Sequence, residues 1–182
     1  NVNMVVCGGD LFHTPIISLN YAGEIAKILK SWNKPIAVVP GNHDLEGYTI
    51  ASINNTMLGM LSSTGVIKIM TRSTPISVNV CGNKVIFEAQ EYFADIDKSP
   101  NNYNKTIDGD LNVLFAHGML QAKPILDTIN HVVISDIPNP ANITFCGHDH
   151  AGFGCITYNN NVFINCGSIG RVDKSNSMKN HK

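Results

Sequence analysis

Short apolar runs, each followed by glycine and then by polar side chains, are the feature that most constrains how this chain can fold. Two of these runs, 2–7 and 35–39, flank a helical pattern over 18–32, in which apolar residues recur every three or four positions. Strand, helix and strand in this order form the basic unit of a parallel α/β sheet. A shorter helix is predicted over 58–63. We therefore expect an α/β domain whose polar residues leave the ends of sheet strands.

The remainder of the chain is dominated by β-strand patterns. Runs rich in β-branched and aromatic residues lie at 66–70, 75–80, 84–89, 111–116, 142–146, 153–158 and 162–166. Two connections are predicted as hairpin turns, one through Cys81 to Asn83 and one through Asn159 to Asn161. The asparagine-rich stretch 95–110 is predicted to be a surface loop. A chain of this length with no internal repeat suits one domain.

Composition and charge exclude a strongly basic protein. The 182 residues are 43% hydrophobic and 15% charged, and the formal net charge is −1. This charge argues against a broad nucleic-acid-binding surface, although a local basic patch remains compatible with it. No apolar run approaches the roughly 20 residues that span a bilayer, and no signal-peptide pattern opens the chain. Because five cysteines occur without a CxxC pair, we expect a soluble, cytoplasmic protein with reduced thiols.

Side chains that can bind metal follow four of the predicted strands. They are Asp10 and His13 in "GGDLFH", Asn42, His43 and Asp44 in "GNHD", His117 in "HG", and His148 and His150 in "GHDH". Because the carboxyl ends of strands in an α/β sheet meet at one edge, we expect these segments to converge. Carboxylate, amide and imidazole without thiolate suit Mn, Fe or Zn better than a closed structural zinc site. Such a metal lowers the pKa of water from about 15.7 toward about 7.

Each motif taken singly also has a structural interpretation. Gly-Asp and "GNHD" are common turn sequences, His117 alone is typical of a structural histidine, and short histidine clusters arise by chance. The occurrence of all four at strand ends favours a metal site. His131 has no partner motif and is interpreted as structural, and Trp32 is interpreted as a core residue of the first helix.

The motifs "GDLFH", "GNHD", an isolated His at a strand end and "GHDH" occur in the order found in calcineurin-like metallophosphoesterases. The chain resembles that superfamily from about Val2 to Ser168, and "GDLFH" is most similar to the SbcD-type double-strand-break repair exonucleases. The resemblance implies an α/β fold, a four-layer α/β/β/α sandwich of two mixed β-sheets with flanking helices. It implies a metallophosphoesterase domain over 1–171 and a polar C-terminal tail over 172–182.

The resemblance also implies a set of metal ligands. Asp10 would bridge two divalent ions, for which Mn is expected and Fe or Zn are alternatives. Asn42, His117 and His148 would complete one metal site, and His150 would serve the other.

Catalytic roles are implied in the same way. His43 would protonate the leaving oxygen, Asp44 would orient the ring of His43, and His13 would contact the phosphate. The family's first motif, Asp-x-His at the end of the first strand, is not in this sequence. We therefore expect the chain to be N-terminally truncated, with that strand and motif upstream of Asn1. We also expect it to bind one ion far better than two and to have weak activity.

Three functions follow from these observations. The first is a metal-dependent phosphoesterase that cleaves phosphodiester bonds with a metal-activated water, as a DNA nuclease or exonuclease with a partner ATPase subunit. The second is a phosphatase or phosphodiesterase for a small phosphoester or nucleotide, which the compact size favours. The third is a catalytically impaired metal-binding scaffold, which the missing Asp-x-His keeps open. A membrane partner is not expected.

Overall fold

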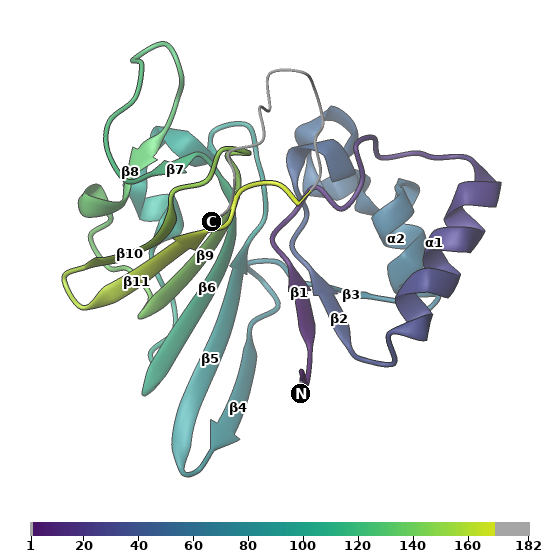
Figure 1. The fold of residues 1–182 in the computed structure, drawn as a ribbon, viewed down its shortest axis with the longest axis horizontal. Coiled ribbons are helices and arrows are strands. Elements are labelled where there is room, and N and C mark those ends of the chain that lie inside the picture. Colours follow the sequence, from purple (N-terminus) through teal and green to yellow (C-terminus); the bar gives the residue numbers. More distant parts are fainter. Residues whose placement is uncertain (1, 170–182) are drawn as a thin grey trace.

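The parallel sheet predicted from the first third of the sequence is present in the computed structural model, which describes residues 2–169 (Figure 1). Strands β1 (Val5–Cys7), β2 (Ile36–Val38) and β3 (Lys68–Ile69) pair in this order, and both pairings are parallel. Helix α1 (Leu19–Ser31) connects β1 to β2, and α2 (Met57–Ser63) precedes β3. The strand–helix–strand prediction is therefore confirmed.

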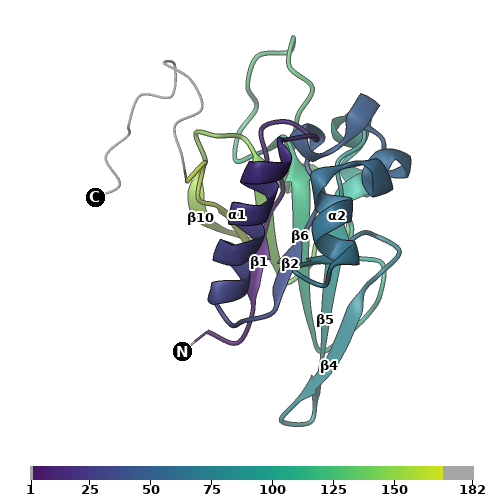
Figure 2. The same ribbon diagram turned by 90° about the vertical axis from the view of Figure 1, so that its right-hand side faces the viewer.

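A larger, mixed sheet lies beside the first (Figures 1 and 2). Its order is β10 (Gly154–Tyr158), β11 (Asn161–Asn165), β9 (Ile143–His148), β6 (Leu111–Gly118), β5 (Asn83–Gln90) and β4 (Ile76–Val80). The four central strands are parallel, and the edge strands β4 and β10 pair antiparallel with their neighbours. Both predicted hairpins are confirmed. Their tight turns are formed by residues with positive φ angles: Cys81 and Gly82 in one, Asn159 and Asn160 in the other.

Within residues 2–169, three apolar cores separate four layers. Helices α1 and α2 cover the outer face of the small sheet with buried side chains such as Leu29, Leu58 and Leu61. The other two cores lie on opposite faces of the large sheet. On strand β6, Val113 faces the core between the sheets, and the next residue, Leu114, faces the outer core. The predicted four-layer α/β sandwich is confirmed.

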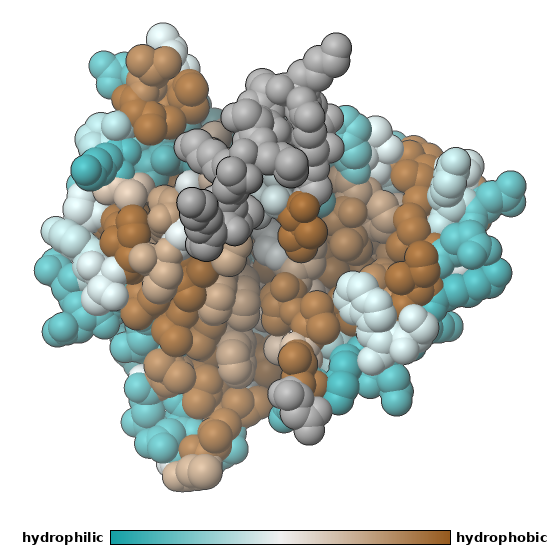
Figure 3. Space-filling view, in the orientation of Figure 1, coloured by the Kyte–Doolittle hydropathy of each residue, from teal (hydrophilic) through white to brown (hydrophobic). Residues whose placement is uncertain are grey.

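The small sheet is narrower than the large one. Part of the inner face of the large sheet is therefore less covered. Ile143 and Phe145 on β9 belong to the core between the sheets, yet they are only half-buried. Figure 3 shows hydrophobic side chains gathered over this face of the large sheet.

The outer layer on the large sheet differs from the α-helices expected there. In residues 2–169 it contains short 3₁₀ helices and a two-stranded parallel sheet instead: η4 (Ile96–Lys98), η5 (Pro100–Tyr103), η6 (Ile134–Asp136), β7 (Leu120–Gln121) and β8 (Val132–Val133). The prediction of a surface loop over 95–110 is only partly right: most of the segment is exposed or half-buried, but it forms η4 and η5 and buries Ile96 and Tyr103. Two apolar side chains anchor a segment whose many asparagines otherwise favour solvent.

The connection from β2 to α2 carries three further 3₁₀ helices, η1 (Asn42–Asp44), η2 (Glu46–Tyr48) and η3 (Ile50–Asn55). The interpretation of Trp32 as a core residue is wrong: it caps the end of α1 and is 48% exposed. No helix within 2–169 has the length and apolar character needed to cross a membrane. The predicted tail over 172–182, and with it the boundary after 171, lies outside the described residues.

Two helical glycines give opposite stability predictions. Gly23 lies inside α1, where an added Cβ would meet no atom within 4 Å. Because alanine is favoured over glycine in a helix, Gly23→Ala should raise the free energy of unfolding by about 0.5–1 kcal/mol in urea titrations. Gly59→Ala in α2 should lower it instead, since the added Cβ would overlap the carbonyl oxygen of Ile53. Equal effects of the two substitutions would contradict the packing described for these helices.

Candidate metal centre

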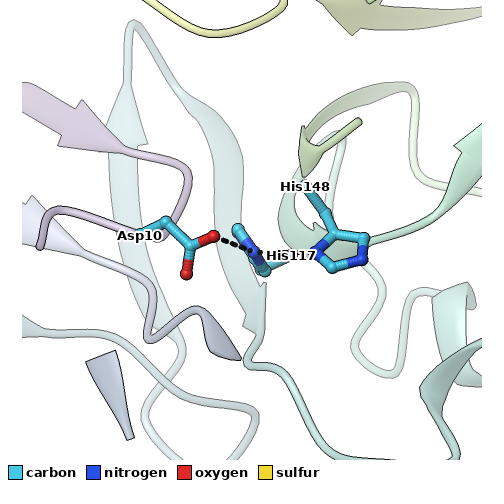
Figure 4. A group of neighbouring side chains, drawn as sticks. All are labelled: Asp10, His117 and His148. Atoms are coloured by element: carbon cyan, nitrogen blue, oxygen red, sulfur yellow. Dashed lines mark hydrogen bonds and ion pairs between the residues drawn. The ribbon is translucent and has the colours of Figure 1, made fainter. Parts of the chain in front are cut away.

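Four strands from the two sheets end at one place in the molecule. The chain leaves β1 toward Asp10 and β2 toward Asn42, while His117 is the last residue but one of β6 and His148 is the last residue of β9. In the register of β6 and β9, His117 pairs with Gly147 and Gly118 pairs with His148, so the two histidines lie on neighbouring strands. Figure 4 shows Asp10 approaching His117 from the small sheet and His148 lying on the other side. The centre is therefore located at the seam between the sheets.

The side-chain atoms of these residues face one another at short range. The His117 Nε2 atom lies 3.2 Å from Asp10 Oδ2 and 3.2 Å from Asn42 Oδ1. The His148 Nδ1 atom lies 3.0 Å from Asn42 Oδ1 and 3.3 Å from His117 Nε2. Asp10, His117 and His148 each direct one ligand atom into a space less than 4.8 Å across.

A backbone carbonyl fixes the orientation and the tautomer of His117. Its ring is 1% exposed, and Nδ1 lies 2.8 Å from the carbonyl oxygen of Gly8. Because a carbonyl oxygen can only accept, Nδ1 must donate, and in the neutral ring Nε2 then presents a lone pair to the centre. Such a contact from the far ring nitrogen is typical of metal-ligating histidines.

The chemistry of this donor set fits a divalent cation. Two imidazole nitrogens, an amide oxygen and a carboxylate oxygen meet, and these atoms have few protons to share among themselves. Ligands about 2.0–2.2 Å from one cation lie roughly 3–3.5 Å from each other, which matches the separations observed. The four residues therefore form a candidate metal site.

Local backbone geometry brings the carboxylate and the imidazole into place. Asp10 and His148 both have left-handed backbones, with φ of 51° and 86°. Such conformations cost an L-residue about 1–2 kcal/mol and are held where the surrounding structure determines them. Two glycines permit this approach, because an added Cβ on Gly9 would overlap the His117 ring and one on Gly41 would overlap the Asp10 carboxylate.

The pKa values favour the protonation states that bind metal. Burial raises the pKa of Asp10, but in the metal-free protein a protonated His117, through its hydrogen bond and charge, and the backbone amide of His43 outweigh burial and lower the pKa overall. Burial, reinforced by the neighbouring His117, lowers the pKa of His148 to about 4. At neutral pH the carboxylate is therefore ionised and the His148 imidazole neutral, as metal coordination requires.

His43 and His13 form a stacked pair beside the four ligands. Their ring centroids are 5.0 Å apart and their planes differ by 18°. The His43 Nδ1 atom lies 3.0 Å from the carbonyl oxygen of His13, and the His43 backbone amide donates to Asp10 Oδ1 at 2.9 Å. The pair is thus connected to the metal centre through Asp10.

Asp44 makes different contacts from those expected. Its carboxylate accepts backbone amides from Gly41 at 3.0 Å, Phe12 at 3.1 Å and Leu11 at 3.4 Å. The side chain is fully buried, and burial raises its pKa against the opposing effect of these amides. The contact that orients the His43 ring is instead the His13 carbonyl. Asp44 therefore joins the loop after β1 to the loop after β2.

The "GHDH" motif contributes one side chain to the centre. The group formed by Asp10, His117 and His148 does not include His150, whose carbonyl oxygen accepts the Ser168 amide at 3.1 Å. The intervening Asp149 accepts a hydrogen bond from Gln121 Nε2 at 3.1 Å and caps the turn through the Ala151 amide at 3.0 Å.

Two contacts at the centre were missed by the sequence interpretation. The Gly8 carbonyl has no side-chain signature, so only the structure reveals it. Tyr92 lies after β5, with its ring centroid 5.7 Å from that of His148 and 6.3 Å from that of His117. Tyr92 follows the predicted strand 84–89. The rule that polar residues after strands converge predicts its position when it is applied to this strand too.

Comparison with known proteins agrees with this geometry. A model of the calcineurin-like phosphoesterase family matches residues 1–152, a range that includes all four motif segments. The chain belongs to this family. A search of curated proteins found no match. The calcineurin-like phosphoesterase assignment confirms the superfamily resemblance and identifies the chemistry as metal-dependent hydrolysis of phosphoester bonds, while the SbcD-type branch stays a prediction.

Metal titration tests the ligand set directly. Isothermal titration with Mn²⁺ should show one cation per chain, because the described ligands form one cluster. His117→Ala should weaken the affinity by at least about 100-fold, since it removes a buried ligand. His131→Gln is the matched control, because among residues 2–169 the His131 ring bonds only to the backbone of Ile129 and Ile125. Unchanged Mn²⁺ affinity in His117→Ala would rule out this ligand set.

The low pKa of His148 predicts a pH-dependent stability in metal-free protein. The unfolded chain takes up a proton near pH 6.5, whereas the folded ring does so only near pH 4. Stability is therefore lost as pH falls from 6.5 to 4, by about 2 kcal/mol between pH 7 and pH 5. Urea unfolding in EDTA should show that loss to be smaller in His148→Asn than in the unsubstituted chain. The same pH dependence in both proteins would refute the low pKa.

Proposed function

We propose that this protein hydrolyses phosphodiester bonds, with DNA as substrate in an exonuclease-like reaction. The observation that carries the proposal is the cluster of Asp10, Asn42, His117 and His148 beside the stacked pair of His43 and His13. When bound, the cation supplies a water of lowered pKa and positive charge for the phosphoryl oxygens. The similarity of "GDLFH" to the SbcD-type exonucleases supports DNA as substrate.

Different residues of the centre have different roles in such a reaction. The four ligands hold the cation, and Asp10 also restrains the His43 amide. In its protonated form, His43 donates through Nδ1 to the His13 carbonyl and offers the Nε2 proton to the leaving oxygen. The stacked His13 ring is exposed, which supports its proposed contact with the phosphate.

The proposed function also includes a metal, a protein partner and a cellular location. We assign Mn²⁺ as the metal, and a second ion would use Asp10 and His150. A partner ATPase subunit belongs to the exonuclease prediction. All five cysteines are free thiols, which supports a reducing, cytoplasmic location.

One observation favours the second candidate, a phosphodiesterase for small phosphoesters. Within residues 2–169, no Lys or Arg side chain hydrogen-bonds to the four ligands or to His43 and His13. Binding of duplex DNA normally requires several such cations on phosphates.

Substrate assays with Mn²⁺ separate these candidates. Release of nucleotides from linear DNA supports the exonuclease, and hydrolysis of bis-p-nitrophenyl phosphate alone supports the small-substrate enzyme. Absence of both activities in a chain that binds Mn²⁺ would support the metal-binding scaffold instead.

Substitution of His43 tests its role as the acid. His43→Ala should lower turnover by about 10²–10⁴-fold, because protonation of the leaving oxygen is lost. The metal content, measured by plasma mass spectrometry, should stay unchanged, since His43 contributes only its backbone amide to Asp10. Loss of the bound metal in this variant would show that His43 is a ligand.

A further inference from the structure

Two tyrosines extend from the metal ligands toward solvent and have no role in the function proposed above. The ring of Tyr92 lies beside the rings of His148 and His117, at centroid distances of 5.7 and 6.3 Å. The ring of Tyr48 packs edge-on against Tyr92, with centroids 6.0 Å apart and planes at 69°. Tyr92 is half-buried and Tyr48 is 56% exposed, so the two rings lead from the buried ligands to the surface.

The backbone at Tyr48 has an uncommon conformation for a bulky residue. Gly47 and Tyr48 have consecutive left-handed φ angles of 59° and 57°. A tyrosine in this region is uncommon, and such strain is concentrated at ligand-binding sites. The residue belongs to η2, directly after the η1 turn that carries Asn42 and His43. The loop that supplies a metal ligand thus also presents Tyr48.

We propose that Tyr48 and Tyr92, here called the aromatic shelf, stack the base of a nucleotide whose phosphate lies at the metal centre. The inference rests on the proposed function and narrows its substrate to phosphoesters that carry a base next to the phosphate at the centre. Because the aromatic shelf begins against His148, it is placed for a base one sugar away from that phosphate. Stacking on tyrosine accepts every base, since each has a π-face.

The chemistry of the aromatic shelf favours a planar group. The two phenol rings present aromatic faces beside the metal ligands, and Tyr48 is exposed to solvent. A base is planar and can stack on such a face.

The aromatic shelf can be tested by comparing the affinities of two ligands, one with a base and one without it. Isothermal titration of the 182-residue chain loaded with Mn²⁺ should show adenosine 5′-monophosphate binding about 5- to 150-fold more tightly than ribose 5-phosphate. Tyr48→Leu should bring this ratio close to one, and Tyr48→Phe should preserve it because the ring is kept. Tyr21→Leu is the matched control and should also preserve it, since Tyr21 is 70% exposed on α1.

The outcomes distinguish this inference from the function on which it rests. Equal affinities for the two ligands, or a ratio that Tyr48→Leu leaves unchanged, would overturn the aromatic shelf while phosphate binding at the metal centre stands. Binding of neither ligand to the Mn²⁺-loaded chain would overturn the proposed function together with the aromatic shelf.

Discussion

The hydrogen bond from His117 Nδ1 to the Gly8 carbonyl is the contact on which the centre depends. It joins the end of β6 in the large sheet to the loop after β1 in the small sheet, across 109 residues of sequence. It fixes the tautomer of a buried ring and directs Nε2 toward Asp10 and Asn42. The same bond thus connects the two sheets at the seam and orients one of the ligands.

This arrangement explains why strain and close packing occur together at the seam. Asp10 and His148 hold left-handed backbones, and Gly9 and Gly41 leave room for the side chains that meet there. Asp44 holds the two loops of the small sheet together through three backbone amides. A cation that satisfies the facing lone pairs would also join the two sheets, so metal binding and folding stability should be linked in this family member.

Much of the fold and the candidate site follows from local patterns in the sequence. Apolar runs with hairpin signals predicted the strands, and the rule that strand ends converge predicted that the four motif segments meet. The choice of Asp10, Asn42, His117 and His148 as one ligand set came from the family resemblance. Contacts decided by the tertiary structure were not predictable in this way. The burial of Tyr103 depends on a core made by distant strands, the exposure of Trp32 on where α1 ends, and the support of His117 on a main-chain carbonyl. The Asp44 carboxylate likewise binds backbone amides, which carry no sequence signature.

Lone pairs from both sheets are directed at one place, where we expect a single cation to bind. Anomalous diffraction from a crystal soaked in Mn²⁺ tests this expectation most directly, because the ion is located without reference to activity. We expect a peak within about 2.0–2.3 Å of Asp10, Asn42, His117 and His148 together. A peak bound elsewhere, with no density between these four side chains, would contradict this ligand set.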